Sequence, residues 1–167
     1  RPANPELVDA REVPRRNFSS LKGRLTLVHA IAHIEFNAIN LALDAAYRFR
    51  GMPHDFYTDW LRIAAEESSH FKMLAEYLEN NGVQYGDYDA HNGLWEMALK
   101  TDHDVMVRMA LVPRVLEARG LDVTPAMIGK LDKVGEQQLV DILKVIHKEE
   151  IGHVLTGTRW FNYVCEQ

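Results

Sequence analysis

The sequence has very little cysteine and no long hydrophobic run. Cys165 is the only cysteine in the 167 residues, so the chain has no second thiol for an internal disulfide, and a reducing compartment is favoured. No apolar run approaches the roughly 20 residues that a membrane span needs. We therefore expect a cytoplasmic protein with no membrane partner, although the first residue, Arg1, is also compatible with a trimmed chain.

An excess of positive charge is absent too. The chain has 19 Lys and Arg against 24 Asp and Glu, a net charge of −5, so its bulk charge gives no support to a nucleic-acid partner. Its length and its ordinary apolar content favour one domain with a sizeable core. A homodimer through exposed helix faces is compatible with the sequence.

Apolar residues recur at helical spacing in four long stretches, and these define the predicted architecture. We expect an all-α fold in which residues 21–167 form a four-helix bundle, preceded by an extended N-terminal arm at residues 1–20. Ser19 or Ser20 is expected to cap the first helix. The loop over residues 81–93 can span on the order of 40 Å, enough for the second and third helices to run parallel. The predicted helices cover residues 21–50, 54–80, 94–119 and 136–164, and a restart of the third helix near Thr101 or Asp102 is the alternative to one unbroken helix.

Proline and glycine residues predict local features around the third helix. Pro113 predicts a kink or a π-bulge just before Glu117, with a simple helix restart as the alternative. Gly120 predicts the end of this helix. Thr124-Pro125 then predicts the start of a short extra helix between the third and fourth helices, ending near residue 134.

The motif Glu-x-x-His occurs twice, and each copy follows a lone glutamate in another predicted helix by 32 or 33 residues. Residues i and i+3 share one helix face, so each motif can direct a carboxylate and an imidazole at one point in the core. Four carboxylates neutralise two divalent cations, and an oxygen and imidazole set without thiolate suits Fe or Mn. We expect two such ions, of one metal or of both, bound by Glu35, Glu67, His70, Glu117, Glu150 and His153.

One ion is expected to be bound by Glu35, Glu67 and His70, and the other by Glu117, Glu150 and His153. The motif glutamates, Glu67 and Glu150, would bridge both ions. Glu35 and Glu117 would be terminal ligands, able to shift and open a position for dioxygen or substrate. The alternative is a metal-free network of buried Glu–His pairs, which is costly, with arginine partners such as Arg62, Arg114 or Arg159.

Other side chains are candidates for contacts that orient the ligands from outside. His147 lies one turn before Glu150 and is either such a partner or an exposed histidine. His103 and Arg114 are two further candidates. A separate pair, His29 and His33, lies on a face of the first helix turned away from the predicted ligands, and predicts either a partly buried pair bonded to a carbonyl or another helix, or an accessory metal role.

Five stretches of the chain are similar to a known family. At these residues the chain resembles the ferritin-like superfamily and, more narrowly, the bacterial family of unknown function DUF455. The superfamily resemblance implies a di-metal four-helix core, and all six ligand positions are filled here. The narrower family implies no known reaction. The stretches are residues 29–35, 59–70, 93–97, 108–125 and 149–153.

Three functions are compatible with these patterns. The favoured one is an oxidoreductase in which the metals activate dioxygen or peroxide on a small organic substrate, with a redox partner where electrons are needed. The second is metal handling or peroxide detoxification without an organic substrate. Iron storage needs a hollow shell of many subunits, and the extended arm and extra helix are not typical of a shell subunit. The third is a non-catalytic bundle that the metal only stabilises.

Overall fold

Residues 4–167, which the computed structural model describes, form helices and connecting loops. The all-α prediction is confirmed for this part of the chain, whereas residues 1–3 of the predicted arm lie outside it. The helices are α1 (Leu21–Arg48), α2 (His54–Asn80), α3 (Gly93–Lys100), α4 (Val105–Leu111), the π-helical segment η1 (Val112–Glu117), α5 (Ala118–Lys133) and α6 (Gln137–Cys165).

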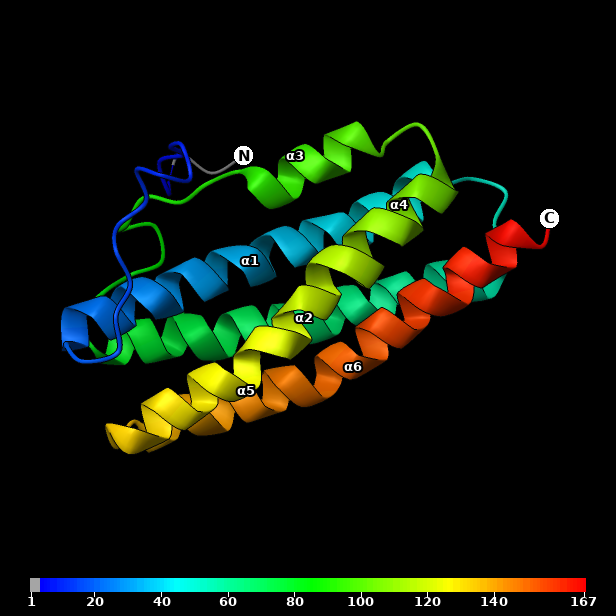
Figure 1. Cartoon of the computed structure of the whole chain (residues 1–167). Helices are drawn as coiled ribbons and strands as arrows, with labels where there is room; N and C mark the ends of the chain where they lie inside the picture. The colour runs from blue at the N-terminus through cyan, green and yellow to red at the C-terminus, as the bar shows by residue number, and fades with distance from the viewer. Residues whose placement is uncertain (1–3) are drawn as a thin grey trace.

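Four long helical stretches lie lengthwise beside one another: α1, α2, the continuous stretch α4–η1–α5, and α6 (Figure 1). α1 and α2 are antiparallel neighbours, joined by a short turn in which Gly51 has a φ of 86°. The loop after α2 and the short helix α3 then return along α1, so that α4 begins at the far end (Figure 1). The second and third long stretches therefore run parallel, as the long crossover predicted.

Side chains cap the N-termini of α1 and α4. The hydroxyl of Ser20 accepts a hydrogen bond from the Gly23 amide at 3.1 Å, which confirms the predicted cap of α1. Asp104 caps α4 by accepting from the amides of Met106 and Val107. The arm is held to the loop before α3, where the Val8 amide donates to the carbonyl of Ala90 at 2.9 Å.

The predicted stop at Gly120 is wrong, and so is the separate short helix after it. α5 runs through Gly120 and carries Pro125 in its interior. Proline has no amide hydrogen, so the carbonyl four residues earlier, that of Leu121, loses its helical partner. Nε2 of His147 on α6 lies 3.3 Å from that carbonyl oxygen. A donor from a neighbouring helix thus replaces the missing hydrogen bond, and the helix continues to Lys133.

Two separate apolar clusters occupy the ends of the long helices. One gathers residues such as Val28, Leu74 and Leu143, and the other gathers Phe56, Met109 and Trp160. Along each of α1, α2 and α6, the predicted ligands fall between the residues of the two clusters. The polar residues are therefore placed midway along the packed helices, with apolar side chains on either side. Between residues 4 and 167, no helix is long and apolar enough to cross a membrane.

Candidate metal centre

Three of the long helices direct acidic and histidine side chains at one point. One ligand atom from each of Glu35, Glu67, His70 and Glu150 lies within 4.8 Å of the corresponding atoms of the other three. Glu35 belongs to α1, Glu67 and His70 to α2, and Glu150 to α6. Glu35, Glu67 and His70 are buried and Glu150 is nearly so. Helical i,i+3 spacing on α2 and the approach of two neighbouring helices thus bring together residues that are far apart in sequence.

Nδ1 of His70 points into this group. It lies 3.2 Å from Oε2 of Glu35, 3.2 Å from Oε2 of Glu67 and 4.0 Å from Oε1 of Glu150. One imidazole nitrogen therefore faces three carboxylates that come from three helices. A nitrogen in this position can serve either as a proton donor to the carboxylates or as a ligand beside them.

His153 and Glu67 carry atoms that have no hydrogen-bond partner. Nδ1 of His153 lies 3.1 Å from Oε1 of Glu67 and 3.4 Å from Oε1 of Glu150. Despite these distances, Nδ1 of His153 and Oε1 of Glu67 are buried and make no hydrogen bond. A buried polar atom without a partner is costly. The two atoms therefore lie side by side, as two ligands of one cation would.

The opposite nitrogen of each histidine binds an outer carboxylate. Nε2 of His70 donates to Oε2 of Glu149 at 2.7 Å, and Nε2 of His153 donates to Oε2 of Glu66 at 2.8 Å. The two hydrogen bonds are reciprocal, because Glu66 lies on α2 beside Glu67 whereas Glu149 lies on α6 beside Glu150. Each bond fixes the ring orientation and leaves Nδ1 directed inward, as carboxylates do for metal-bound histidines.

Glu117 ends the π-helical segment η1, which confirms the predicted backbone irregularity next to it. Its Oε2 is buried and makes no hydrogen bond. It is not in the group of four, but it is close enough to Glu150 and Glu67 for their charges to affect its pKa. η1 packs on α6, where a β-carbon built on Gly157 would collide with the ring of Pro113. Gly157 thereby permits the approach of the segment that carries Glu117.

The electrostatics of the carboxylates favour protonation or a cation. Burial raises the pKa of Glu35 and of Glu117 well above the ordinary value, and it also raises the pKa of Glu150. Burial acts on Glu67 in the same direction, but His153 and His70 outweigh it and lower the pKa of Glu67 to about 2. Three of the four carboxyl groups therefore favour protonation when no cation is bound.

For the two histidines, burial lowers the pKa and the neighbouring carboxylates raise it. Burial disfavours the charged form of His70, yet hydrogen bonds to Glu35 and Glu67 raise its pKa to about 10. Burial also opposes protonation of His153, but Glu150 and Glu67 raise its pKa to about 11. Protons therefore supply the positive charge of the site in the absence of metal. A metal ion that binds here has to displace them, which couples binding to proton release.

The remaining candidate residues have contacts of other kinds. His147 donates a hydrogen bond to the Leu121 carbonyl. His103 is largely exposed and lies 3.9 Å from Asp102. The Arg114 guanidinium lies over the ring of Phe161 at 4.0 Å from its centroid. Within residues 4–167, no arginine forms an ion pair with any of the four predicted ligand glutamates. Arg62 instead pairs with Glu66, the outer partner of His153, at 2.9 Å, so an arginine meets this network only at its edge.

Comparison with known proteins identifies the family of the chain. The family model described as "Protein of unknown function (DUF455)" matches residues 1–167. The chain belongs to the DUF455 family. It is 51% identical over 173 residues to an uncharacterised protein of Haemophilus influenzae, an alignment that includes 99% of this chain. The chain spans 60% of the length of that relative. No solved structure has a significant match.

Glu66 and Glu149 of this DUF455 protein also belong to the candidate centre, but they are not among the residues predicted from the sequence. A signal for them exists, because both motifs read Glu-Glu-x-x-His when one more residue is included. Helical spacing turns the first glutamate of each pair about 100° away from the second, so it does not share the helix face of the predicted ligands. Its partner is the histidine of the other motif, on the neighbouring helix.

Proposed function

We propose that this DUF455 protein is a di-metal carboxylate oxidoreductase of ferritin-like architecture, with two Fe or Mn ions in the centre described above. The ligands would be Glu35, Glu67, His70, Glu117, Glu150 and His153. The arrangement of four long helical stretches with one long crossover supports the ferritin-like assignment. The bound ions would supply redox chemistry toward dioxygen or peroxide, with a small organic substrate as the acceptor.

Two buried atoms that make no hydrogen bond, one on Glu67 and one on His153, carry this proposal. Oε1 of Glu67 and Nδ1 of His153 are 3.1 Å apart, an ion-pair contact that lacks the geometry of a hydrogen bond. A buried polar group that lacks its hydrogen bond costs about 1–3 kcal/mol. A cation bound by both atoms removes that cost. The oxygen and imidazole donor set fits Fe or Mn better than it fits soft-ligand metals.

Glu67 is suited to hold both ions. Its Oε2 lies 3.2 Å from Nδ1 of His70, and its Oε1 lies 3.1 Å from Nδ1 of His153. Glu150 likewise lies near both histidines, at 4.0 Å and 3.4 Å. These positions support a bridging role for the two motif glutamates. Glu35 and Glu117 are each near one side of the set, which supports terminal roles for them.

The surrounding residues would provide the conditions that such chemistry needs. The apolar clusters on either side exclude water from the helix interior and strengthen electrostatic interactions there. Glu66 and Glu149 hold the rings of His153 and His70 in one orientation. Glu117, with one oxygen free of hydrogen bonds at the end of a π-helical segment, can change its contacts without breaking an existing one.

Oxygen uptake by metal-loaded protein tests the proposed chemistry. The protein is loaded with Fe(II) under anaerobic conditions, freed of unbound metal, and mixed with oxygenated buffer in an oxygen electrode. We expect uptake faster than that of free Fe(II), lost in Glu67→Gln and retained in Glu76→Gln, a matched change on the exposed face of the same helix. Uptake no faster than that of free Fe(II) would contradict the oxidoreductase proposal, even if the metal binds.

A further inference from the structure

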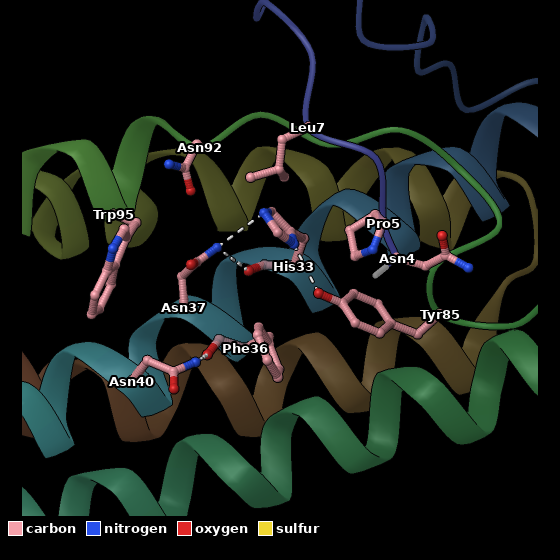
Figure 2. A pocket seen from close by; sticks show the side chains of 10 residues that line it. All are labelled: Asn4, Pro5, Leu7, His33, Phe36, Asn37, Asn40, Tyr85, Asn92 and Trp95. Atoms are coloured by element: carbon pink, nitrogen blue, oxygen red, sulfur yellow. Dashed lines mark hydrogen bonds between the residues drawn. The ribbon is translucent and has the colours of Figure 1, made fainter. Parts of the chain in front are cut away.

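A second site lies outside the metal centre. A cavity of about 270 Å³ opens between the N-terminal arm, the outer face of α1, the loop after α2, and α3 (Figure 2). The metal proposal uses none of the side chains that line it. Its volume is just below the roughly 300–1,000 Å³ of pockets for drug-sized molecules. A ligand here would accordingly be small.

Charged side chains are missing from the described part of the cavity lining. Among residues 4–167, none of those that line it is Asp, Glu, Lys or Arg, although 26% of the whole chain is charged. A charged ligand would lose hydration without gaining a counter-charge. The lining therefore favours a neutral ligand over an anion or a cation.

Side-chain amides supply the polar part of the lining. Nδ2 of Asn37 donates to Nε2 of His33 at 3.0 Å and to the carbonyl of His33 at 2.9 Å, which uses both of its hydrogens and leaves Oδ1 as an acceptor. Nδ2 of Asn40 donates to the carbonyl of Phe36 at 2.7 Å, so one N–H and the oxygen of this amide are uncommitted. Within residues 4–167, the side chain of Asn92 makes no hydrogen bond. The cavity thus offers donors and acceptors together.

Aromatic rings form the flat surfaces. Phe36 and Tyr85 are held in place by ring contacts with each other and with Phe71, whose ring centroid lies 4.9 Å from that of Tyr85. The Tyr85 hydroxyl lies 2.8 Å from Nδ1 of His33, which fixes it further. In Figure 2, Trp95 of α3 lies across the cavity from Tyr85. A planar ring can stack on these aromatic surfaces.

We propose that this cavity binds a small neutral heterocycle of the nucleobase class. Such a molecule combines a flat aromatic ring with hydrogen-bond donors and acceptors along its edge. Asparagine amides pair with that edge in a bidentate manner, and aromatic side chains stack on its face. The cavity size admits one free base better than it admits a larger ligand. Binding of a base in this cavity needs no metal, so its test is independent of the test of the proposed oxidoreductase.

The test is direct binding of free bases to the metal-free protein. Adenine, cytosine and uracil serve as probes, with saturation-transfer NMR for detection and calorimetry for the dissociation constant. Orotate, which is uracil with a carboxylate, is the charged control. We expect at least one base to bind, with orotate at least tenfold weaker than uracil if uracil is that base. The indole N–H of Trp95 and the amide of Asn92 should shift in ¹⁵N spectra on binding.

Variants then locate the site. Trp95→Leu removes the stacking surface and should weaken binding about tenfold or more. Asn92→Ala removes an amide that supports no other hydrogen bond, so its fold is expected to persist and its binding to weaken severalfold. Asn80→Ala, an exposed asparagine at the end of α2, is the matched control. No binding by any base at millimolar concentration, or binding that Trp95→Leu and Asn92→Ala leave unchanged, would overturn the proposal.

Discussion

Oε2 of Glu66 on α2 accepts a hydrogen bond from Nε2 of His153 on α6 at 2.8 Å. Glu149 on α6 does the same for His70 on α2 at 2.7 Å. Each Glu-Glu-x-x-His segment hence provides the inner ligands of its own helix and the outer partner of the other helix. This exchange joins α2 to α6 at the level of the candidate metal centre and gives the centre an approximate twofold arrangement.

Removal of the outer carboxylates should weaken metal binding without removing a ligand. For Glu66→Gln and Glu149→Gln, we expect metal affinity to fall by roughly 10–100-fold, because the histidine ring is no longer fixed by a charged acceptor. The number of ions bound at saturation should stay the same. Competition against a fluorescent chelator measures the affinity. Glu76→Gln on the exposed face of α2 is the control, and equal affinities for all three variants would show that the outer carboxylates do not support the ligands.

Gly157 is expected to be essential to the position of η1. Ala at this position would collide with Pro113, and the required shift should destabilise the protein by about 1–3 kcal/mol. Gly152→Ala on the same helix meets nothing within 4 Å and should stabilise the helix by roughly 0.5–1 kcal/mol. Urea unfolding compares the two. If Gly157→Ala were as stable as Gly152→Ala, the close approach of α6 and η1 would be wrong.

His147 and Pro125 should show strong coupling. His147→Ala leaves the Leu121 carbonyl without a donor and should cost about 1 kcal/mol in the free energy of unfolding. In the background of Pro125→Ala, the restored amide can donate to that carbonyl, so the same substitution should cost much less. A double-mutant cycle measured by urea unfolding gives the coupling. Additive effects would mean that His147 does not compensate for the proline.

The pH dependence of stability should reveal His29. Burial lowers the pKa of this histidine, against the opposing charges of Asp87 and Asp89, and its Nε2 accepts a hydrogen bond from the Gly86 amide at 2.9 Å. Because its pKa is lower in the folded state, the unfolded chain takes up the proton first as pH falls below about 6.5. The stability that the neutral ring contributes is therefore fully present above that pH and declines below it.

A comparison with His29→Gln isolates this effect from the other titrating groups. The free energy of unfolding of the wild-type protein should fall more steeply than that of the variant between about pH 6.5 and pH 5. Denaturant titrations at several pH values provide the measurement. Parallel curves for the two proteins would show that folding leaves the pKa of His29 unchanged and would contradict this prediction.

The spacing of glutamate and histidine was enough to predict the group around Glu67, because i,i+3 periodicity and burial are local properties of a helix. Contacts between helices were harder to predict. Glu66 is absent from the predicted site because its contact with His153 depends on the packing of α6 against α2. Gly120 and Thr124-Pro125 carry strong local stop signals, yet a histidine 26 residues from Leu121 in sequence overrides them. Tertiary hydrogen bonds of this kind leave no periodic pattern in the sequence.

The most direct test of the central claim is the metal content of the purified protein, measured by elemental analysis after anaerobic addition of Fe(II) or Mn(II) and removal of unbound metal. The double variant Glu67→Ala/Glu150→Ala, which lacks both motif glutamates, is the control. The di-metal account predicts about two ions per chain in the wild-type protein and a near-complete loss in the variant. Near-zero metal in the wild-type protein would contradict it and leave the six residues as a buried polar network.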